Sequence, residues 1–131
     1  MPAAQPEPVV YDAGALIAAD RNNRELWADH RARLEAGVLP LVPAPAVARA
    51  SRSLSQVQLR RLLRGCDVVA MTEPDAHEVG GLLAKSATSD VVDAFVALLA
   101  SHEHANTVTS DSAELSHLLR CAGGTARVIE V

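Results

Sequence analysis

The chain of 131 residues has only two cysteines, Cys66 and Cys121, and they do not form a CxxC pair. Two isolated cysteines supply neither a disulfide framework nor a cysteine-rich zinc site. We therefore expect both to be small buried or half-buried side chains. The sequence also lacks a GxGxxG or GKS/GKT loop, and this absence argues against the usual phosphate-binding loops of nucleotide-binding folds.

Aromatic residues and excess positive charge are also scarce. Tyr11, Trp27 and Phe95 are the only aromatic residues, too few for the base-stacking platform of many single-strand binders. The formal net charge of -4 argues against holding nucleic acid by overall electrostatics alone. The segment 49–64 differs, because it has no acid and five arginines: Arg49, Arg52, Arg60, Arg61 and Arg64. We expect a solvated helix face there, with contact to RNA phosphates or to a protein partner as the alternative.

Long hydrophobic runs are absent as well. The longest, at 91–100, suits a buried helix, since a membrane span requires about 20 apolar residues. The first eight residues have neither the basic start nor the apolar stretch of a signal peptide, so we expect a cytoplasmic protein. The length and the hydrophobic content of 49% predict one domain over 1–131 with a sizeable core.

Short β-branched runs alternate with helical segments along the chain. Strands are predicted at 9–11, 38–43, 67–71, 106–109 and 126–131. Helices are predicted at 13–19, 25–36, 45–51, 53–64 with a serine cap, 74–87, 90–100 and 113–121. Strands that are apolar without alternation indicate a parallel sheet covered by helices. The expected fold is therefore an α/β/α sandwich with four to five parallel strands.

The helix predicted over 90–100 is apolar on almost every side, yet two carboxylates lie near its start. Thr88 or Ser89 is expected to cap it, and Asp90 complements the helix dipole. Asp93 is surrounded by apolar residues, where a charge is costly unless a cation or strong donors meet it. We therefore expect Asp93 to have a charged or metal partner.

Two further aspartates, Asp12 and Asp111, directly follow predicted strands. In an open parallel sheet the carboxyl ends of the strands meet at one edge, where the strand order reverses. If the helix carrying Asp93 begins at that edge, three or four carboxylates converge and repel one another unless a cation is present. Mg²⁺ or Mn²⁺ suits such oxygen ligands, and metal-assisted phosphodiester hydrolysis is the chemistry this arrangement most often serves.

Simpler roles compete with metal binding at several positions. Asp12 and Asp111 each suit the N-cap of the following helix, and Asp90 suits either a ligand or a partner of the helix dipole. Glu114 is expected to be a surface or capping residue rather than a ligand. The segment 102–104 (HEH) lacks the i, i+4 histidine pair of a zinc motif, so solvated histidines are expected there.

Three segments resemble the acidic motifs of the PIN domain: 9–16 (VVYDAGAL), 93–100 (DAFVALLA) and 107–111 (TVTSD). The resemblance covers the whole chain in order and spacing, and it is strongest to the VapC-type toxins of bacterial toxin–antitoxin pairs. It implies a PIN-like three-layer fold and Mg²⁺- or Mn²⁺-dependent endoribonuclease activity on structured RNA such as tRNA or rRNA. It also implies a homodimer and a VapB-like antitoxin that covers the acidic groove.

The resemblance also assigns roles to individual residues. By this assignment the catalytic, metal-binding carboxylates would be Asp12, Asp93 and Asp111. Asp90 would be an additional metal ligand. Thr109 or Ser110 would support the loop of the third catalytic aspartate and a bound water.

Arg49 departs from the family pattern. The family usually has a glutamate in the helix after the second strand, whereas the matching position here is Arg49, and no acid occurs from Gly37 to Cys66. An arginine does not ligate a metal, but it can pair bidentately with an aspartate of the cluster. Three interpretations follow: a one-metal nuclease in which Asp90 compensates, an enzyme whose Arg49 holds the RNA phosphate, or a degenerate PIN domain that binds antitoxin or RNA without cleaving.

Overall fold

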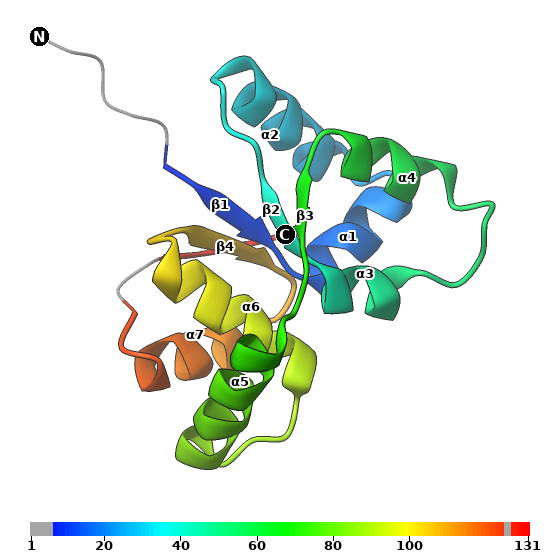
Figure 1. Cartoon of the computed structure of the whole chain (residues 1–131). Coiled ribbons are helices and arrows are strands. Elements are labelled where there is room, and N and C mark those ends of the chain that lie inside the picture. Colours follow the sequence, from blue (N-terminus) through cyan, green and yellow to red (C-terminus); the bar gives the residue numbers. More distant parts are fainter. Residues whose placement is uncertain (1–6, 125–126) are drawn as a thin grey trace, which may run out of the picture.

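A five-stranded parallel sheet forms the middle layer of the molecule, with strand order β3-β2-β1-β4-β5 (Figure 1). Its strands are β1 (Val9–Tyr11), β2 (Leu41–Pro43), β3 (Asp67–Val69), β4 (Asn106–Thr109) and β5 (Val128–Glu130). The structure is a computed structural model that describes residues 7–124 and 127–131. The prediction of a parallel α/β sheet is confirmed, and position 126 of the last predicted strand lies outside the described residues.

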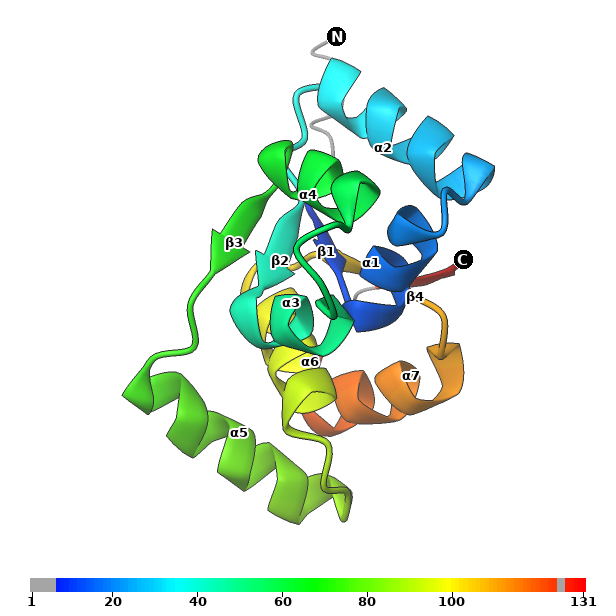
Figure 2. The ribbon, with the colours of Figure 1, turned by 90° about the vertical axis from the view of Figure 1, so that its right-hand side faces the viewer.

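Helices cover both faces of this sheet (Figure 2). They are α1 (Ala13–Asp20), α2 (Arg24–Glu35), α3 (Ala44–Ala50), α4 (Val57–Arg64), α5 (Glu73–Ser86), α6 (Val91–His102) and α7 (Ser112–Cys121). One buried cluster joins the sheet to α1–α4, and a second joins it to α5–α7. Within the described residues, none of the helices combines the length and the apolarity that a bilayer crossing requires.

Strand β1 separates the two cores. Its residues are fully buried, and they alternate in direction: Val9 and Tyr11 belong to the core with α1–α4, whereas Val10 belongs to the core with α5–α7. This alternation is the period of two that every strand imposes on its side chains. The central strands are covered on both faces and have no polar side, which explains why 9–11 and 41–43 are apolar without alternation.

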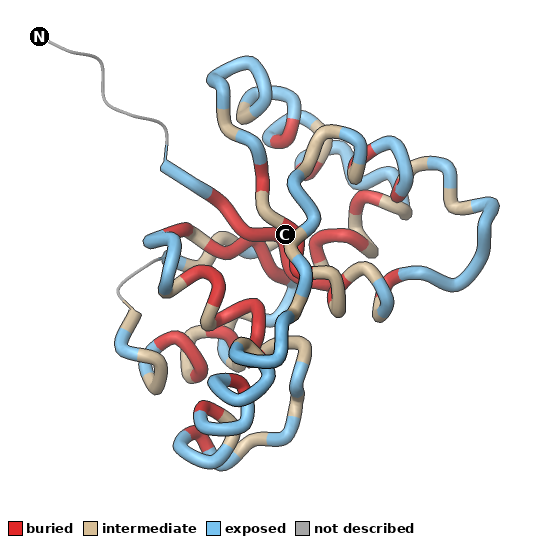
Figure 3. The backbone as a smooth tube through the Cα atoms, viewed as in Figure 1, coloured by how far each residue is buried: buried red, intermediate tan, exposed pale blue. Residues whose placement is uncertain are grey.

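Helix α6 is the most buried helix of the second layer (Figure 3). The apolar pattern of 90–100 predicted this burial, but the predicted cap was wrong. Asp90, not Thr88 or Ser89, is the N-cap, and its carboxylate accepts a hydrogen bond from the Asp93 amide at 3.0 Å. The Thr88 hydroxyl instead lies 2.7 Å from the Ser86 hydroxyl. Asp90 therefore positions the first turn of α6 as well as carrying charge.

The start of α4 also differs from the prediction. The helix begins at Val57 without a side-chain cap, because the hydroxyls of Ser53 and Ser55 lie 2.6 Å apart and engage each other. The Gln56 side-chain oxygen instead accepts hydrogen bonds from the backbone amides of Arg52 and Ser53. Residues 51–55 therefore form an exposed loop between α3 and α4 (Figure 3).

The strand order reverses between β1 and β4, so the carboxyl ends of these neighbours form the switch point of the sheet. The Asp12 amide donates to the Val108 carbonyl at 3.1 Å, which joins the end of β1 to the end of β4. Gly14 then passes the loop after β4 so closely that a Cβ atom at this position would overlap the Ser110 side chain. The glycine is required by this close approach.

Gly14→Ala is expected to destabilise the folded protein by about 1–3 kcal/mol, because the loop at Ser110 would have to move to admit the new methyl group. Gly80→Ala and Gly81→Ala are the controls. Both positions on α5 face open space, and helix propensity predicts a gain of about 0.5–1 kcal/mol for each. Urea denaturation measures all three, and a Gly14→Ala protein as stable as the wild type would contradict the close packing.

Candidate metal centre

The first turns of α6 and α7 bring three carboxylates together. Asp90 caps α6, Asp93 lies in its first turn, and Glu114 lies in the first turn of α7. Each residue offers one oxygen, and these oxygens lie within 4.8 Å of one another. We call Asp90, Asp93 and Glu114 the acidic cluster. Its ligand atoms are all carboxylate oxygens, the donor type that Mg²⁺ and Mn²⁺ prefer.

Glu114 is the member of the acidic cluster that the sequence pattern did not reveal. It was expected at the surface or in a capping role, yet it is half-buried and its carboxylate lies with those of Asp90 and Asp93. Asp111 caps α7 and accepts the Glu114 amide at 3.3 Å, which orients the first turn of the helix. Glu114 reaches the cluster because α7 packs against α6, and no local sequence pattern indicates this packing.

Arg49 enters the acidic cluster from α3. Its Nη1 donates to Asp90 Oδ2 at 3.0 Å and its Nη2 donates to Asp90 Oδ1 at 2.9 Å, so the predicted bidentate pair with an aspartate is confirmed. Arg49 Nη1 also lies 3.6 Å from Asp93 Oδ1, an ion pair without a hydrogen bond. The guanidinium thus pairs closely with Asp90 and only loosely with Asp93.

The two aspartates of α6 consequently differ in acidity. Burial tends to raise the pKa of Asp90, but the hydrogen bonds from Arg49 and from the Asp93 amide outweigh it and hold that pKa below its ordinary value. Burial, the neighbouring Asp90 carboxylate and Glu114 raise the pKa of Asp93 to about 7. Only 13% of the Asp93 side chain is exposed. The charge expected to need a cation is therefore the one on Asp93.

Asp12 lies at the end of β1 and is almost completely buried. Its Oδ1 accepts the Ala15 amide at 2.8 Å, so it also has the expected N-cap role at the start of α1. Burial raises the pKa of Asp12, while hydrogen bonds from Thr109 and from the α1 amides lower it in part. Thr109 therefore contacts Asp12, one of the three carboxylates predicted from the sequence.

Asp111, after β4, is exposed, as is the adjacent Ser110. The Asp111 amide donates to Thr109 Oγ1 at 2.9 Å, which supports the loop in the way expected of this threonine. Asp111 is also close enough to Asp12 to raise its pKa. In the part of the chain that the structure describes, Asp12 and Asp111 lie outside the acidic cluster, at the ends of adjacent strands.

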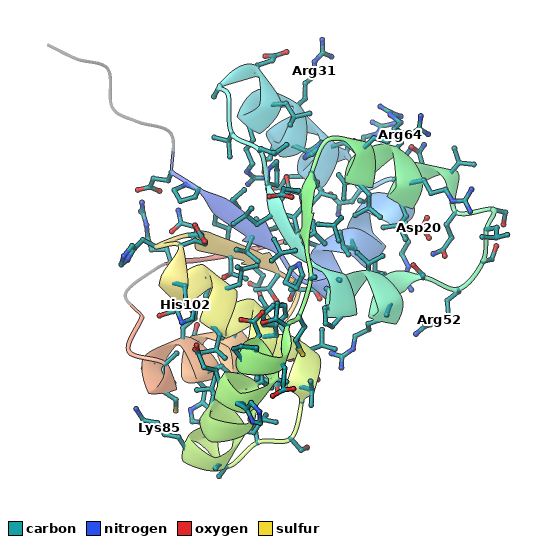
Figure 4. The ribbon with its side chains drawn as sticks, viewed as in Figure 1. Asp20, Arg31, Arg52, Arg64, Lys85 and His102 are labelled. Atoms are coloured by element: carbon teal, nitrogen blue, oxygen red, sulfur yellow. The ribbon has the colours of Figure 1, made fainter. Side chains whose placement is uncertain are left out.

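The other arginines of 49–64 lie on the surface. Arg52 and Arg60 line a groove of about 490 Å³ between α3 and α4, together with apolar side chains such as Leu59. Arg61 stacks on the Trp27 ring, with 4.5 Å between the guanidinium carbon and the ring centroid. Figure 4 shows Arg52 and Arg64 pointing outward from their elements. The segment is thus largely the solvated face predicted for it, and Arg49 alone enters the acidic cluster.

Comparisons with known proteins identify the fold. Neither a protein-family model nor a curated protein sequence matches the chain. PAE2754 from Pyrobaculum aerophilum superposes with a TM-score of 0.63 at 20% identity, over 95% of this chain and 91% of that one. VapBC2 from Rickettsia felis, bound to a DNA fragment from its promoter, superposes with a TM-score of 0.70 at 12% identity, over 95% and 98%. The chain has the PIN-like fold expected from its three acidic segments.

Without metal, the contribution of Asp93 to the free energy of unfolding is expected to fall as the pH rises from about 4 to about 7. The raised pKa of Asp93 means that the folded chain keeps a proton which the unfolded chain has already lost, so stability present at low pH is lost through this range. Asp93→Asn removes this ionisation. In urea denaturation with EDTA, the free energy of unfolding of this variant should not show the decrease due to Asp93. Near pH 8 the variant should be more stable than the wild type. Identical pH profiles for the two proteins would argue against a raised pKa of Asp93.

Proposed function

We propose that the protein is a divalent-metal-dependent endoribonuclease, the toxin of a toxin–antitoxin pair, which cleaves structured RNA such as tRNA or rRNA. The observation that carries the proposal is the acidic cluster of Asp90, Asp93 and Glu114 at the starts of α6 and α7, within a PIN-like fold. The likeness to VapBC2 supports the toxin assignment. The proposal treats residues 1–131 as a single domain that acts in the cytoplasm.

The residues present fit a hard divalent cation. When all three carboxylates of the acidic cluster are ionised they carry three negative charges, and Arg49 supplies one positive charge, so two negative charges remain. One Mg²⁺ or Mn²⁺ ion would neutralise them. Asp93 and Glu114 would hold this ion, with Asp90 as an additional ligand that Arg49 shares. Asp12 and Asp111 complete the proposed catalytic set from the adjacent strand ends.

Such an ion, when bound, lowers the pKa of a coordinated water and offsets charge on the scissile phosphate. The remaining roles belong to side chains of the chain itself. Thr109 holds the Asp111 loop through the Asp111 amide and contacts Asp12, so it links the two strand ends that carry these carboxylates. Burial raises the pKa of Asp12, so this carboxylate binds a proton more readily than an exposed aspartate and is a candidate proton acceptor. Ser110 would contact a water or the substrate at the open side.

The proposed partners follow from the same fold. A VapB-like antitoxin would cover the acidic cluster and the neighbouring groove, and a second copy of the chain would complete a homodimer. The likeness to VapBC2 supports the antitoxin assignment, and the homodimer rests on the resemblance of the three acidic segments alone. The exposed Leu54 and Val57, with exposed fractions of 83% and 65%, offer apolar area for such a contact beside the groove.

A second candidate function is supported by one observation, the bidentate pair of Arg49 with Asp90. A guanidinium already seated in the acidic cluster reduces the need for a metal ion. On this view the chain is a degenerate PIN domain that binds its antitoxin or RNA without cleaving it.

Cleavage of total tRNA and rRNA by the purified, antitoxin-free chain decides between the two candidates. With Mn²⁺ or Mg²⁺ we expect cleavage, which EDTA abolishes and Asp93→Asn reduces by about 100-fold or more, because each removes charge complementarity at the reacting phosphate. Asp29→Asn, an exposed acid of α2, is the matched control and should cleave like the wild type. Folded protein that cleaves none of these RNAs would favour the degenerate domain.

The groove arginines generate a separate prediction for RNA affinity. Arg52→Ala combined with Arg60→Ala should weaken RNA binding in EDTA and reduce the slope of log affinity against log salt by about one for each phosphate that the protein no longer neutralises. Filter binding between low and moderate salt measures this slope. Arg31→Ala, on the outer face of α2, is the control and should leave the slope unchanged (Figure 4). A double variant with the wild-type slope would place RNA elsewhere on the surface.

A further inference from the structure

Arg49 is held in place by the helix that carries it. It lies in the last turn of α3, whose Ala46 and Ala50 are buried in the core with α1 and α4. The same helix contacts α6, so its last turn faces the start of that helix (Figure 2). Both oxygens of Asp90 then receive the guanidinium in the planar geometry that arginine offers. The position of Arg49 is therefore set by the fold rather than by a flexible loop.

Charge in the acidic cluster is consequently unequal. Asp90 has three hydrogen-bond donors, namely the two Arg49 nitrogens and the Asp93 amide. Asp93 receives only the longer 3.6 Å contact from Arg49, and Glu114 lies opposite it at the start of α7. The side of the cluster formed by Asp93 and Glu114 therefore keeps the uncompensated negative charge.

We propose that Arg49 is a resident cation of the acidic cluster, which takes up the charge that a second metal ion would neutralise and so limits the centre to one divalent ion on the Asp93 and Glu114 side. This inference rests on the proposed metal centre and deepens it. A guanidinium keeps its proton at any physiological pH and does not exchange with solvent, unlike a bound ion. Part of the charge of this centre is thus compensated permanently.

Two opposite effects follow from such a role. A fixed positive charge repels an incoming divalent ion, so Arg49 lowers the metal affinity of the cluster. The same charge relieves repulsion among three close carboxylates, so Arg49 stabilises the metal-free fold. A purely structural role of Arg49 would stabilise the metal-free fold without lowering metal affinity. A role limited to RNA contact would do neither.

Titration calorimetry with Mn²⁺ on the full chain tests the first effect. Wild-type protein should bind one ion. Arg49→Met should bind Mn²⁺ about tenfold more tightly or bind a second ion, because the repelling charge is gone. Arg49→Glu should bind two ions, while Arg49→Lys, which keeps the charge, should remain close to the wild type.

Arg31→Met is the matched control for loss of a paired arginine. Arg31 forms an ion pair with Glu35 at 3.2 Å, but this pair lies on the outer surface of α2 (Figure 4). Its removal should change neither the number of bound Mn²⁺ ions nor their affinity.

Thermal unfolding tests the second effect and keeps the proposal falsifiable if Arg49→Met folds poorly. In EDTA this variant should unfold at a lower temperature than the wild type, and saturating Mn²⁺ should raise its unfolding temperature more than it raises that of the wild type. If the variant does not fold in EDTA, Arg49→Lys should fold there, and Mn²⁺ should restore folding of Arg49→Met.

Three results would overturn the inference: two Mn²⁺ ions on the wild type, no Mn²⁺ on either protein, or equal number and affinity on the wild type and Arg49→Met. RNA cleavage is a separate readout. A wild-type chain that binds one ion, loosely compared with Arg49→Met, yet cleaves no RNA would refute the proposed nuclease and would still support Arg49 as the resident cation.

Discussion

Repulsion among carboxylates at the start of α6 is the constraint on which the site depends. Asp90, Asp93 and Glu114 come from two helices and meet in a half-buried position, where water screens charge less than at the surface. The chain answers this repulsion unequally. Arg49 pairs with Asp90, while the charge of Asp93 is poorly compensated and the pKa of this carboxyl group is raised to about 7. The carboxylates of Asp93 and Glu114 are therefore the ones that could hold an external cation.

The fold explains why these groups cannot move apart to relieve the repulsion. Helix α6 is buried along most of its length, and α3 is held by small buried alanines, so the backbone positions of the charged residues are set by core packing. Gly14 and Ser110 add a further restraint at the switch point, where β1 and β4 end side by side. Rigid elements hold like charges close together, whereas flexible loops would let them move apart. Ion binding and catalysis depend on charge that is preorganised in this way.

Arg49 stands where the PIN-domain resemblance implies a glutamate, and this difference bears on the electrostatics of the site. A glutamate at position 49 would add a negative charge to the acidic cluster and increase its demand for cations, whereas Arg49 removes one unit of that demand. If a divalent ion binds as proposed, metal loading and fold stability are coupled through this single side chain.

The sequence by itself determined the parallel α/β architecture, the burial of α6 and the need of Asp93 for a charged partner, because apolar periodicity and helix signals are local properties. It also indicated that Arg49 pairs with an aspartate of the cluster. Only the tertiary structure decided which aspartate that is, that Asp90 rather than Thr88 caps α6, and that Glu114 joins the cluster. These outcomes depend on how α3 and α7 pack against α6, and packing brings together residues whose sequence separation carries no information about their distance.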